Sequence, residues 1–240
     1  MLKICRTILL FFLPSFILCW LFSIKARKKI KNVHIGFSII YVDSLEIEDN
    51  IHIGNGNKII IHSLKMKQGS RINKRNSFFG KFSLFLNKEA VISRHNKFNS
   101  DNSPYTNRIL SLGENAIIVS QHSFDVTRSI KIGDNSIIAG SNSQVWTHSF
   151  YHSKNGKGRW RVDSEVNIGN NVYVGSMCVI CPGVTICDST HIGAAVCVSK
   201  SLTKSGLYVN QPLRFIEMDP DEAVKRYKVI QEEPFNIIEK

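Results

Sequence analysis

The segment from Ile168 to Val198 repeats with a period of six residues. An aliphatic residue opens each unit, at Ile168, Val174, Ile180, Ile186, Ile192 and Val198. A fixed short period indicates one small structural unit stacked on copies of itself, because a single unit cannot bury its apolar side alone. This repeat limits the possible folds more than any other feature of the chain.

The length of the period distinguishes between kinds of secondary structure. A helix places apolar residues every three or four positions, and an amphipathic strand places them every two. A period of six, interrupted by glycines and by Asn-Asn or Pro-Gly pairs, is typical of short strands joined by tight turns. The sequence therefore predicts an all-β solenoid, a parallel β-helix.

The same spacing continues upstream with less regularity. It is visible in the segments 132–137 and 112–117, and again from Ile47 to Ile59. Between about Lys65 and Arg108 the pattern slips, and polar stretches there are typical of loops. We therefore expect the N-terminal coils to be irregular.

Three segments carry a resemblance to a known family: IGDNSIIAGSNSQVWTHS at 132–149, VNIGNNVYVGSMCVICPGVTI at 166–186, and IGAAVCVSKSL at 192–202 with VNQPLRFI after it. In these segments the chain resembles the hexapeptide-repeat acyltransferases of the left-handed β-helix fold, particularly those that O-acetylate sugars and bacterial polysaccharides. The resemblance implies a left-handed β-helix over residues 32–216, a homotrimer, and acetyl-CoA bound between neighbouring subunits. It implies no metal.

The N-terminal segment 1–31 predicts a membrane anchor. Residues 8–24 are apolar apart from serines and Pro14, and seven Lys or Arg but no acid lie within 1–31, out of a net charge of +12. Basic residues after an apolar segment favour a cytoplasmic position for the domain beyond them, which predicts the cytoplasmic face of the inner (cell) membrane. Because Pro14 removes a helix hydrogen bond, a re-entrant anchor is an alternative to a full span. A hydrophobic helix packed against the protein is a third possibility.

Two other classes of partner are not favoured. The chain contains no basic helix, zinc finger or aromatic RNA-binding motif, so we expect no nucleic-acid partner. Cys178 and Cys181 form a C-x-x-C pair, with Cys187 and Cys197 further on. Cys178 is the fifth residue of its six-residue unit, Cys181 and Cys187 are second residues and Cys197 is a sixth. Because adjacent units lie on different faces of a coil, the four thiols would not converge on one tetrahedral ion, so we expect no metal.

The strongest candidate for a catalytic group is His148. Transfer of an acyl group from a thioester to a hydroxyl requires a base, and an imidazole can take the proton and return it to the departing thiolate. The repeat breaks directly after His148 and restarts near Val166. In the resembled family the catalytic histidine precedes a loop that interrupts the repeats, so the resemblance assigns His148 this role.

The insertion at 149–165 predicts part of the acceptor site. An aromatic ring between cations suits stacking on a sugar and pairing with an anionic group, although a solvated charged loop is an equal alternative. The candidate acceptor-binding residues are Trp146, Arg159, Trp160, Arg161, His122 and His152.

Candidate donor-binding residues come from the resemblance. It implies that Ser176 and Ala194 are small where the pantetheine arm passes, that Ser199 and Lys200 lie near the nucleotide, and that Arg214 is the terminal basic residue. Basic side chains suit the phosphates of coenzyme A.

Residues 217–240 predict a helical cap, because Asp219-Pro220-Asp221-Glu222 is typical of a helix start. Taken together, the sequence predicts an acetyl-CoA-dependent O-acetyltransferase acting on a hydroxyl of a bacterial cell-surface polysaccharide or its sugar precursor. An amino-sugar N-acyltransferase, a serine acetyltransferase-like enzyme, a relative of cation-binding carbonic anhydrases and a non-catalytic scaffold remain as alternatives.

Overall fold

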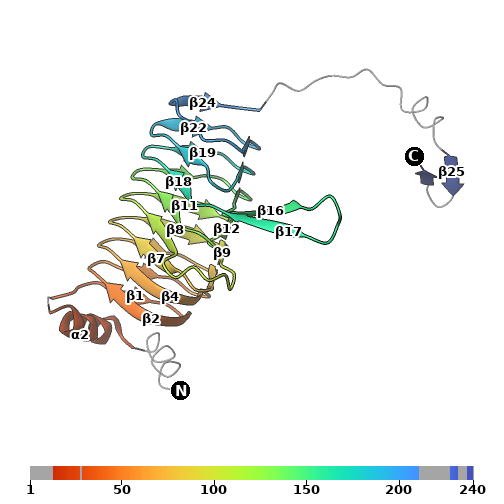
Figure 1. Cartoon of the computed structure of the whole chain (residues 1–240). Helices are drawn as coiled ribbons and strands as arrows, with labels where there is room; N and C mark the ends of the chain where they lie inside the picture. The colour runs from red at the N-terminus through yellow and green to blue at the C-terminus, as the bar shows by residue number, and fades with distance from the viewer. Residues whose placement is uncertain (1–12, 28, 211–227, 232–236, 240) are drawn as a thin grey trace. The chain divides into compact units, whose positions relative to one another are not determined.

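The computed structural model describes residues 13–27, 29–210, 228–231 and 237–239. The described residues up to Asn210 form one compact unit, and those from Lys228 onward belong to a second. The first unit is a parallel β-solenoid with one helix at its N-terminal end (Figure 1). The prediction of a parallel β-helix is confirmed.

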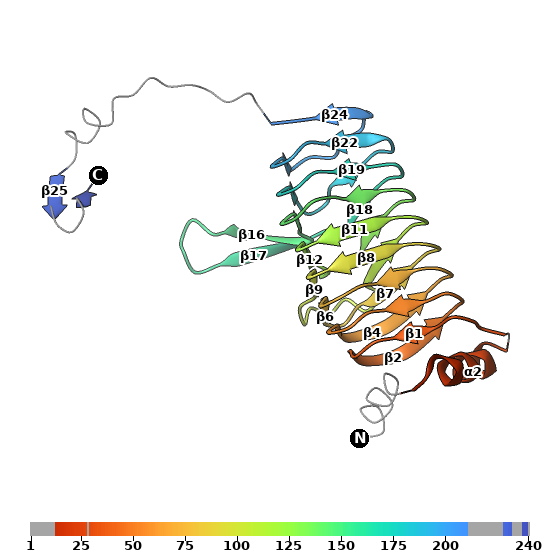
Figure 2. The ribbon, with the colours of Figure 1, turned by 180° about the vertical axis from the view of Figure 1, so that it is seen from behind.

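The first face of the solenoid is a nine-stranded parallel sheet that receives one strand from each coil (Figure 2). Its strands, in order, are β1 (His34–Ile35), β3 (His52–Ile53), β5 (Arg71–Ile72), β8 (Val91–Arg94), β11 (Ile117–Ser120), β14 (Ile137–Ile138), β19 (Tyr173–Val174), β22 (Thr190–Ile192) and β24 (Gly206–Tyr208).

A thirteen-stranded sheet forms the other two faces. The long strand β4 (Lys58–Met66) belongs to both, because its first half pairs with one strand and its second half with another. Strand β4 also pairs with β2 (Ile39–Ile47) along its length. The second face continues from the first half of β4 as β6 (Ser77–Phe79), β9 (Lys97–Asn99), β12 (Ser123–Asp125), β15 (Gln144–Val145), β20 (Val179–Ile180) and β23 (Cys197–Val198). The third face continues from its second half as β7 (Ser83–Leu86), β10 (Ile109–Leu112), β13 (Ile130–Ile132), β18 (Val166–Ile168) and β21 (Thr185–Ile186).

Aligned apolar side chains fill the interior. In the second face Phe78, Phe98 and Phe124 are aligned in register, with ring centroids 4.5 and 4.9 Å apart. At the corners, a Cβ on Gly133 would lie 2.5 Å from the backbone of Gly169, so the residue after the repeated aliphatic must be glycine there. Close stacking of corners therefore explains the Ile-Gly pairs of the repeat.

The expectation of irregular coils between Lys65 and Arg108 is wrong for most of that segment. Strands β5 to β9 keep parallel register through it, and only the stretch from Ser100 to Arg108 is a loop. Polar residues obscured the repeat there: some are exposed and others, such as Asn76 and Asn96, are buried, while the alternate apolar residues form the core.

A column of buried polar side chains runs along the solenoid between the first and second faces. The backbone N–H of each member donates to the side chain of the member one coil earlier, over distances of 2.9 to 3.1 Å. The polar column consists of Ser38, Asn57, Asn76, Asn96, His122, Ser143 and the N–H of Cys178. It satisfies backbone groups that the turns leave unpaired.

The two ends of the chain carry the remaining predicted elements. Helix α2 (Ser15–Ala26) packs Leu18 and Phe22 into the core at the first coil. Among the described residues, no helix is both long and apolar enough to cross a membrane. In the predicted helical cap, the described residues form an antiparallel pair, β25 (Lys228–Gln231) and β26 (Ile237–Glu239), so the helix is wrong there. The predicted helix start at 219–222 lies outside the described residues.

Candidate active site

Neighbouring coils of the second face bring an imidazole and a carboxylate together. Asp125 ends β12, and His148 lies three residues after β15; Phe124 and Val145 are partners in register. His148 Nδ1 lies 2.8 Å from Asp125 Oδ2. An ionised carboxylate only accepts hydrogen bonds, so Nδ1 carries the hydrogen and Nε2 of the neutral ring keeps its lone pair.

Asp125 is held as an anion by its surroundings. Burial favours the neutral acid, but hydrogen bonds from Thr147, Thr127 and His148 outweigh it and lower the pKa of Asp125. Thr147 donates from its backbone N–H over 3.0 Å and from Oγ1 over 2.7 Å, and Thr127 Oγ1 donates over 2.7 Å. The side chain of Asp125 is 10% exposed and that of His148 is 26% exposed, so the imidazole alone is open to a ligand.

The imidazole is flanked by two aromatic rings. Trp146 and Phe150 are two residues to either side of His148, so in an extended chain all three point the same way. Both rings meet the imidazole edge-on, with centroids 5.7 and 5.8 Å away. Trp146 is fixed by a 3.0 Å hydrogen bond from Nε1 to Gln144 Oε1. These half-exposed rings would suit the apolar faces of a sugar.

The insertion that interrupts the repeat is a β-hairpin, β16 (His148–His152) paired with β17 (Arg159–Asp163). Side chains alternate between its two faces, and directly opposed residues share a face. His148, Phe150 and His152 therefore share one face with their partners Asp163, Arg161 and Arg159, whereas the other face carries Ser149, Tyr151, Trp160 and Val162.

This pairing divides the predicted acceptor residues. Arg159 and His152 lie on the same face as the imidazole and are exposed. Trp160 is on the opposite face, so the expected cluster of Trp160 with the two arginines does not form. His122 does not contribute to an acceptor surface either. It is fully buried in the polar column, where its Nδ1 accepts a hydrogen bond from the N–H of Ser143.

Arg161 holds the hairpin to the solenoid. Its guanidinium donates to Asp163 over 2.6 Å and to Asp101 in the loop after β9. The hydrogen bond to Asp101 is the main cause that raises the pKa of Arg161. Arg161 is therefore engaged by two carboxylates, which leaves Arg159 as the more available cation.

The loop after β9 is itself organised around Arg108, which is almost fully buried. Its guanidinium donates to the backbone carbonyls of Tyr105, Asp101 and Ser103. Because those carbonyls fix the loop, Asp101 is presented to Arg161. Sequence reasoning missed Arg108, Asp101 and Asp125; each is paired with a residue distant along the chain or with backbone groups, and no local motif marks them.

The predicted donor residues lie along the upper coils of the second face. Ser176 and Ala194 occupy one corner on successive coils, in line with Gly140, where a Cβ would collide with Ser176. Ser199 and Lys200 are exposed after β23, at the corner where Trp146 follows β15. Arg214 lies outside the described residues.

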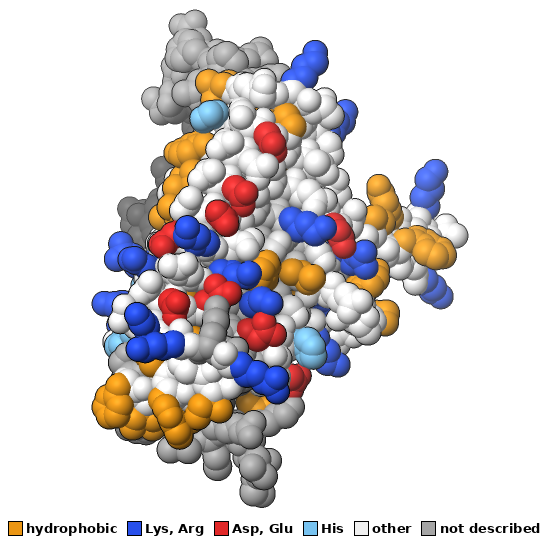
Figure 3. Space-filling model, turned by 90° about the vertical axis from the view of Figure 1, so that its left-hand side faces the viewer, with side chains coloured by type: hydrophobic (Ala, Val, Ile, Leu, Met, Phe, Trp, Pro, Cys, Tyr) orange, Lys and Arg blue, Asp and Glu red, His pale blue; other side chains and the backbone are white. Residues whose placement is uncertain are grey.

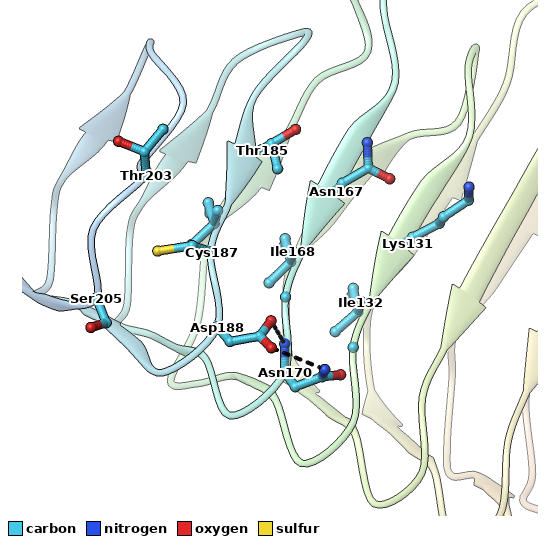
Figure 4. Close-up of a pocket in the computed structure, with 13 residues that line it drawn as sticks. Lys131, Ile132, Asn167, Ile168, Asn170, Thr185, Cys187, Asp188, Thr203 and Ser205 are labelled. Carbon is cyan, nitrogen blue, oxygen red and sulfur yellow. Dashed lines mark hydrogen bonds between the residues drawn. The ribbon is translucent and has the colours of Figure 1, made fainter.

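A shallow groove of about 660 Å³ runs along the third face near the C-terminal end (Figure 4). Asn170 donates to Asp188 within it, over 2.7 Å from the backbone N–H. The groove contains none of the predicted site residues, and its small side chains from successive coils are the ordinary outer surface of a solenoid. The corner that carries His148, whose imidazole is paired with Asp125, is therefore the better candidate for an active site than this groove.

Metal chemistry finds no support among the cysteines. Across the described part of the chain, no group of three or more His, Cys, Asp or Glu could hold a metal ion. Cys178 is buried, and burial raises the pKa of its thiol. Burial likewise raises the pKa of Cys181, with a further contribution from Cys197.

Part of the chain is similar in sequence to a sugar acetyltransferase. The chain is 41% identical to galactoside O-acetyltransferase of Escherichia coli (strain K12) over 68 residues, which are 27% of this chain and 34% of that protein. The match and the solenoid together make the chain similar to hexapeptide-repeat acetyltransferases. The chain thus matches about a third of the length of that relative. No protein-family model matches the sequence.

Solved structures with a similar course of the chain include a galactoside acetyltransferase in complex with coenzyme A, at 26% identity over 53% of this chain and 62% of that one, with a TM-score of 0.39. Another is the polySia specific acetyltransferase NeuO, at 16% identity over 83% of this chain and 91% of that one, with a TM-score of 0.40.

Proposed function

We propose that this protein is an acetyl-CoA-dependent O-acetyltransferase that uses His148 as its general base. The observation that carries the proposal is the 2.8 Å contact between His148 Nδ1 and Asp125, which leaves Nε2 of the neutral ring unprotonated on a partly exposed side chain. The match to a galactoside O-acetyltransferase supports the reaction class.

In this mechanism His148 Nε2 takes the proton of a sugar hydroxyl as the oxygen attacks the thioester carbonyl carbon. The tetrahedral intermediate then collapses, the C–S bond breaks, and the imidazolium returns the proton to the departing thiolate. The products are the acetyl ester and coenzyme A with a free thiol. Asp125 stabilises the imidazolium that forms between these steps.

We further propose that the donor lies along the second face between the corner of Ser176 and Ala194 and that of Ser199 and Lys200. The small corner residues would allow close approach of the pantetheine arm, and Lys200 offers a charge for phosphate. By its resemblance the enzyme is a homotrimer, with the donor between subunits.

The acceptor is a hydroxyl of a cell-surface polysaccharide or its sugar precursor, and the enzyme works at the cytoplasmic face of the membrane. Arg159 and His152 on the face of the imidazole favour an acceptor with a negative charge. Trp146 and Phe150 would contact the sugar ring.

The test is acetyl transfer by the full chain from acetyl-CoA to a panel of neutral, anionic and amino sugars, with products detected by mass spectrometry. We expect His148→Ala to lower kcat by at least about 100-fold, in the range of a lost general base. His62→Ala is the matched control, because His62 Nδ1 also contacts a carboxylate, that of Asp43 at 3.1 Å, but at an exposed position of β4, four strands away from β15 along the second face. Equal activity of wild type and His148→Ala would refute the mechanism, and acetylation of amines alone would favour an N-acyltransferase.

A cellular test addresses the acceptor. Mass spectrometry of surface glycans with and without the gene should reveal the loss of one acetyl group per repeat when the gene is deleted. An unchanged glycan would contradict the proposed polysaccharide acceptor.

A further inference from the structure

Helix α2 closes the N-terminal end of the solenoid with one side and leaves the other side open. Leu18 and Phe22 face the first coil, and Leu18 is only 1% exposed. Phe16, Trp20 and Ile24 are spaced at intervals of four residues, so they form one stripe along the helix. Their exposed fractions are 72%, 62% and 59%.

This stripe, Phe16–Trp20–Ile24, is part of a larger apolar surface at the same end. Phe37 and Ile39, from the first coil, are also exposed. In the space-filling view hydrophobic side chains gather at the end of the molecule that carries the helix (Figure 3). Contiguous apolar surface of this kind marks an interaction site.

Basic residues border the stripe. Helix α2 ends at Arg27, whose N–H donates to the carbonyl of Ile24, and the chain then returns to the solenoid. Arg27, Lys29 and Lys31 are exposed on this return segment. The return is fixed, because Ile30 N–H donates to Ser23 Oγ over 2.8 Å. Cations therefore lie directly beside the exposed apolar side chains.

We propose that α2 lies in the plane of an anionic lipid surface, with Phe16, Trp20 and Ile24 inserted and the basic return segment against the headgroups. A short helix that leaves aromatic and aliphatic side chains exposed, with cations beside it, suits the interface of an anionic membrane, where aromatic rings lie at headgroup level and basic residues are attracted to the surface. Its 12 residues span about 18 Å at 1.5 Å per residue, short of the roughly 30 Å hydrocarbon core. The side of the helix that carries Leu18 and Phe22 already packs against the solenoid. This inference does not depend on acetyl transfer.

The experiment is flotation of the full-length protein with vesicles of phosphatidylcholine alone or mixed with phosphatidylglycerol. We expect stronger binding to the anionic vesicles. The triple variant Phe16→Gln, Trp20→Gln, Ile24→Gln should bind at least ten times more weakly, because three apolar side chains no longer leave water. The variant Arg27→Gln, Lys29→Gln, Lys31→Gln should lose the preference for anionic lipid.

A matched control removes apolar surface from the other end of the solenoid. Leu207 and Val209 are as exposed as the stripe, so Leu207→Gln, Val209→Gln should bind vesicles like the wild type. Thermal unfolding shows whether each variant is folded. The substitutions are on exposed positions, and glutamine is a good helix former.

The depth of Trp20 distinguishes an in-plane helix from a spanning one. In a protein with Trp146→Phe and Trp160→Phe, Trp20 is the remaining tryptophan. Its fluorescence should be quenched more by bromine near the headgroup end of the acyl chains than by bromine near the chain ends. The reverse order would overturn the in-plane arrangement. Unaltered binding by the triple variant, or a triple variant that instead dissociates an oligomer in light scattering, would overturn lipid as the occupant.

Discussion

At the scale of single residues, Asp125 determines which ring nitrogen of His148 carries the hydrogen. Three hydrogen-bond donors besides the imidazole keep it ionised and fixed. The tautomer of the imidazole follows from that charge, which leaves the lone pair on Nε2. In the proposed mechanism Asp125 acts through His148 and is a positioning residue.

Replacing Asp125 with asparagine tests this role. The amide can donate to Nδ1, which would favour the tautomer with hydrogen on Nε2 and so remove the base. We expect kcat to fall by about 10²- to 10⁴-fold, as in related carboxylate–histidine pairs, with little change in KM for the acceptor. Steady-state kinetics on the folded variant measure both. Asp43→Asn is the control, and an equal loss there would contradict the assignment.

His122 governs a different property, the dependence of stability on pH. Burial in the polar column lowers its pKa to about 4, although backbone groups partly offset this. The unfolded chain takes up a proton near pH 6.5 that the folded chain excludes, so stability is present above that pH and is lost as pH falls toward 4.

The variant His122→Asn retains an acceptor for the N–H of Ser143 but does not titrate. Between pH 7 and pH 5 the wild type should lose about 2 kcal/mol more unfolding free energy than the variant, from the difference between the two pKa values. Urea unfolding at both pH values measures this, and that window lies above the range in which carboxylates titrate. Parallel losses in the two proteins would show that His122 is not responsible.

At the scale of elements, the hairpin β16–β17 shows what the sequence predicted of the insertion and what it did not. A charged, glycine-containing insertion is correctly located by the break in the repeat, but its pairing decides which side chains share a face. Arg161 and Trp160 are adjacent in β17, so they lie on opposite faces of the hairpin. Arg161 binds Asp101 and so acts as a clamp between the hairpin and the solenoid, whereas the ring of Trp160 is exposed.

The clamp can be tested by loosening it. In Arg161→Gln we expect the amides of β16 and β17 to exchange hydrogen faster, because the hairpin loses its bonds to Asp101 and Asp163. Exchange in the coils should not change. Arg159→Gln serves as control, since it neutralises a neighbouring exposed arginine, and equal acceleration in both variants would contradict the clamp.

At the scale of the whole molecule, the six-residue period predicted the solenoid because the repeated aliphatic residues are its core. It did not predict which coils lie beside each other around the site. Asp125 and His148 are 23 residues apart, and only the alignment of Phe124 with Val145 brings them together. The regular coils at 65–99 were missed because polar residues, some exposed and some buried in the polar column, hide the aliphatic repeat there.

The oligomeric state is a further prediction at this scale. If the donor binds between subunits, the protein purified in mild detergent should have three times the mass of one chain in native mass spectrometry. Ser176→Trp should weaken acetyl-CoA binding without changing that mass, because it fills the corner shared with Ala194. A monomer with full activity would contradict the proposed trimer.

The fixed spacing of the parallel strands also sets the distance between helix α2 and the imidazole of His148. Five inter-strand steps along the first face separate β1, beside helix α2, from β14, in the coil that leads to His148. At about 4.8 Å per step, the imidazole stands roughly 24 Å from the helical end. With that end resting on lipid, the reaction would occur at a constant height above the bilayer, and the gain or loss of one coil would select a longer or shorter lipid-linked sugar.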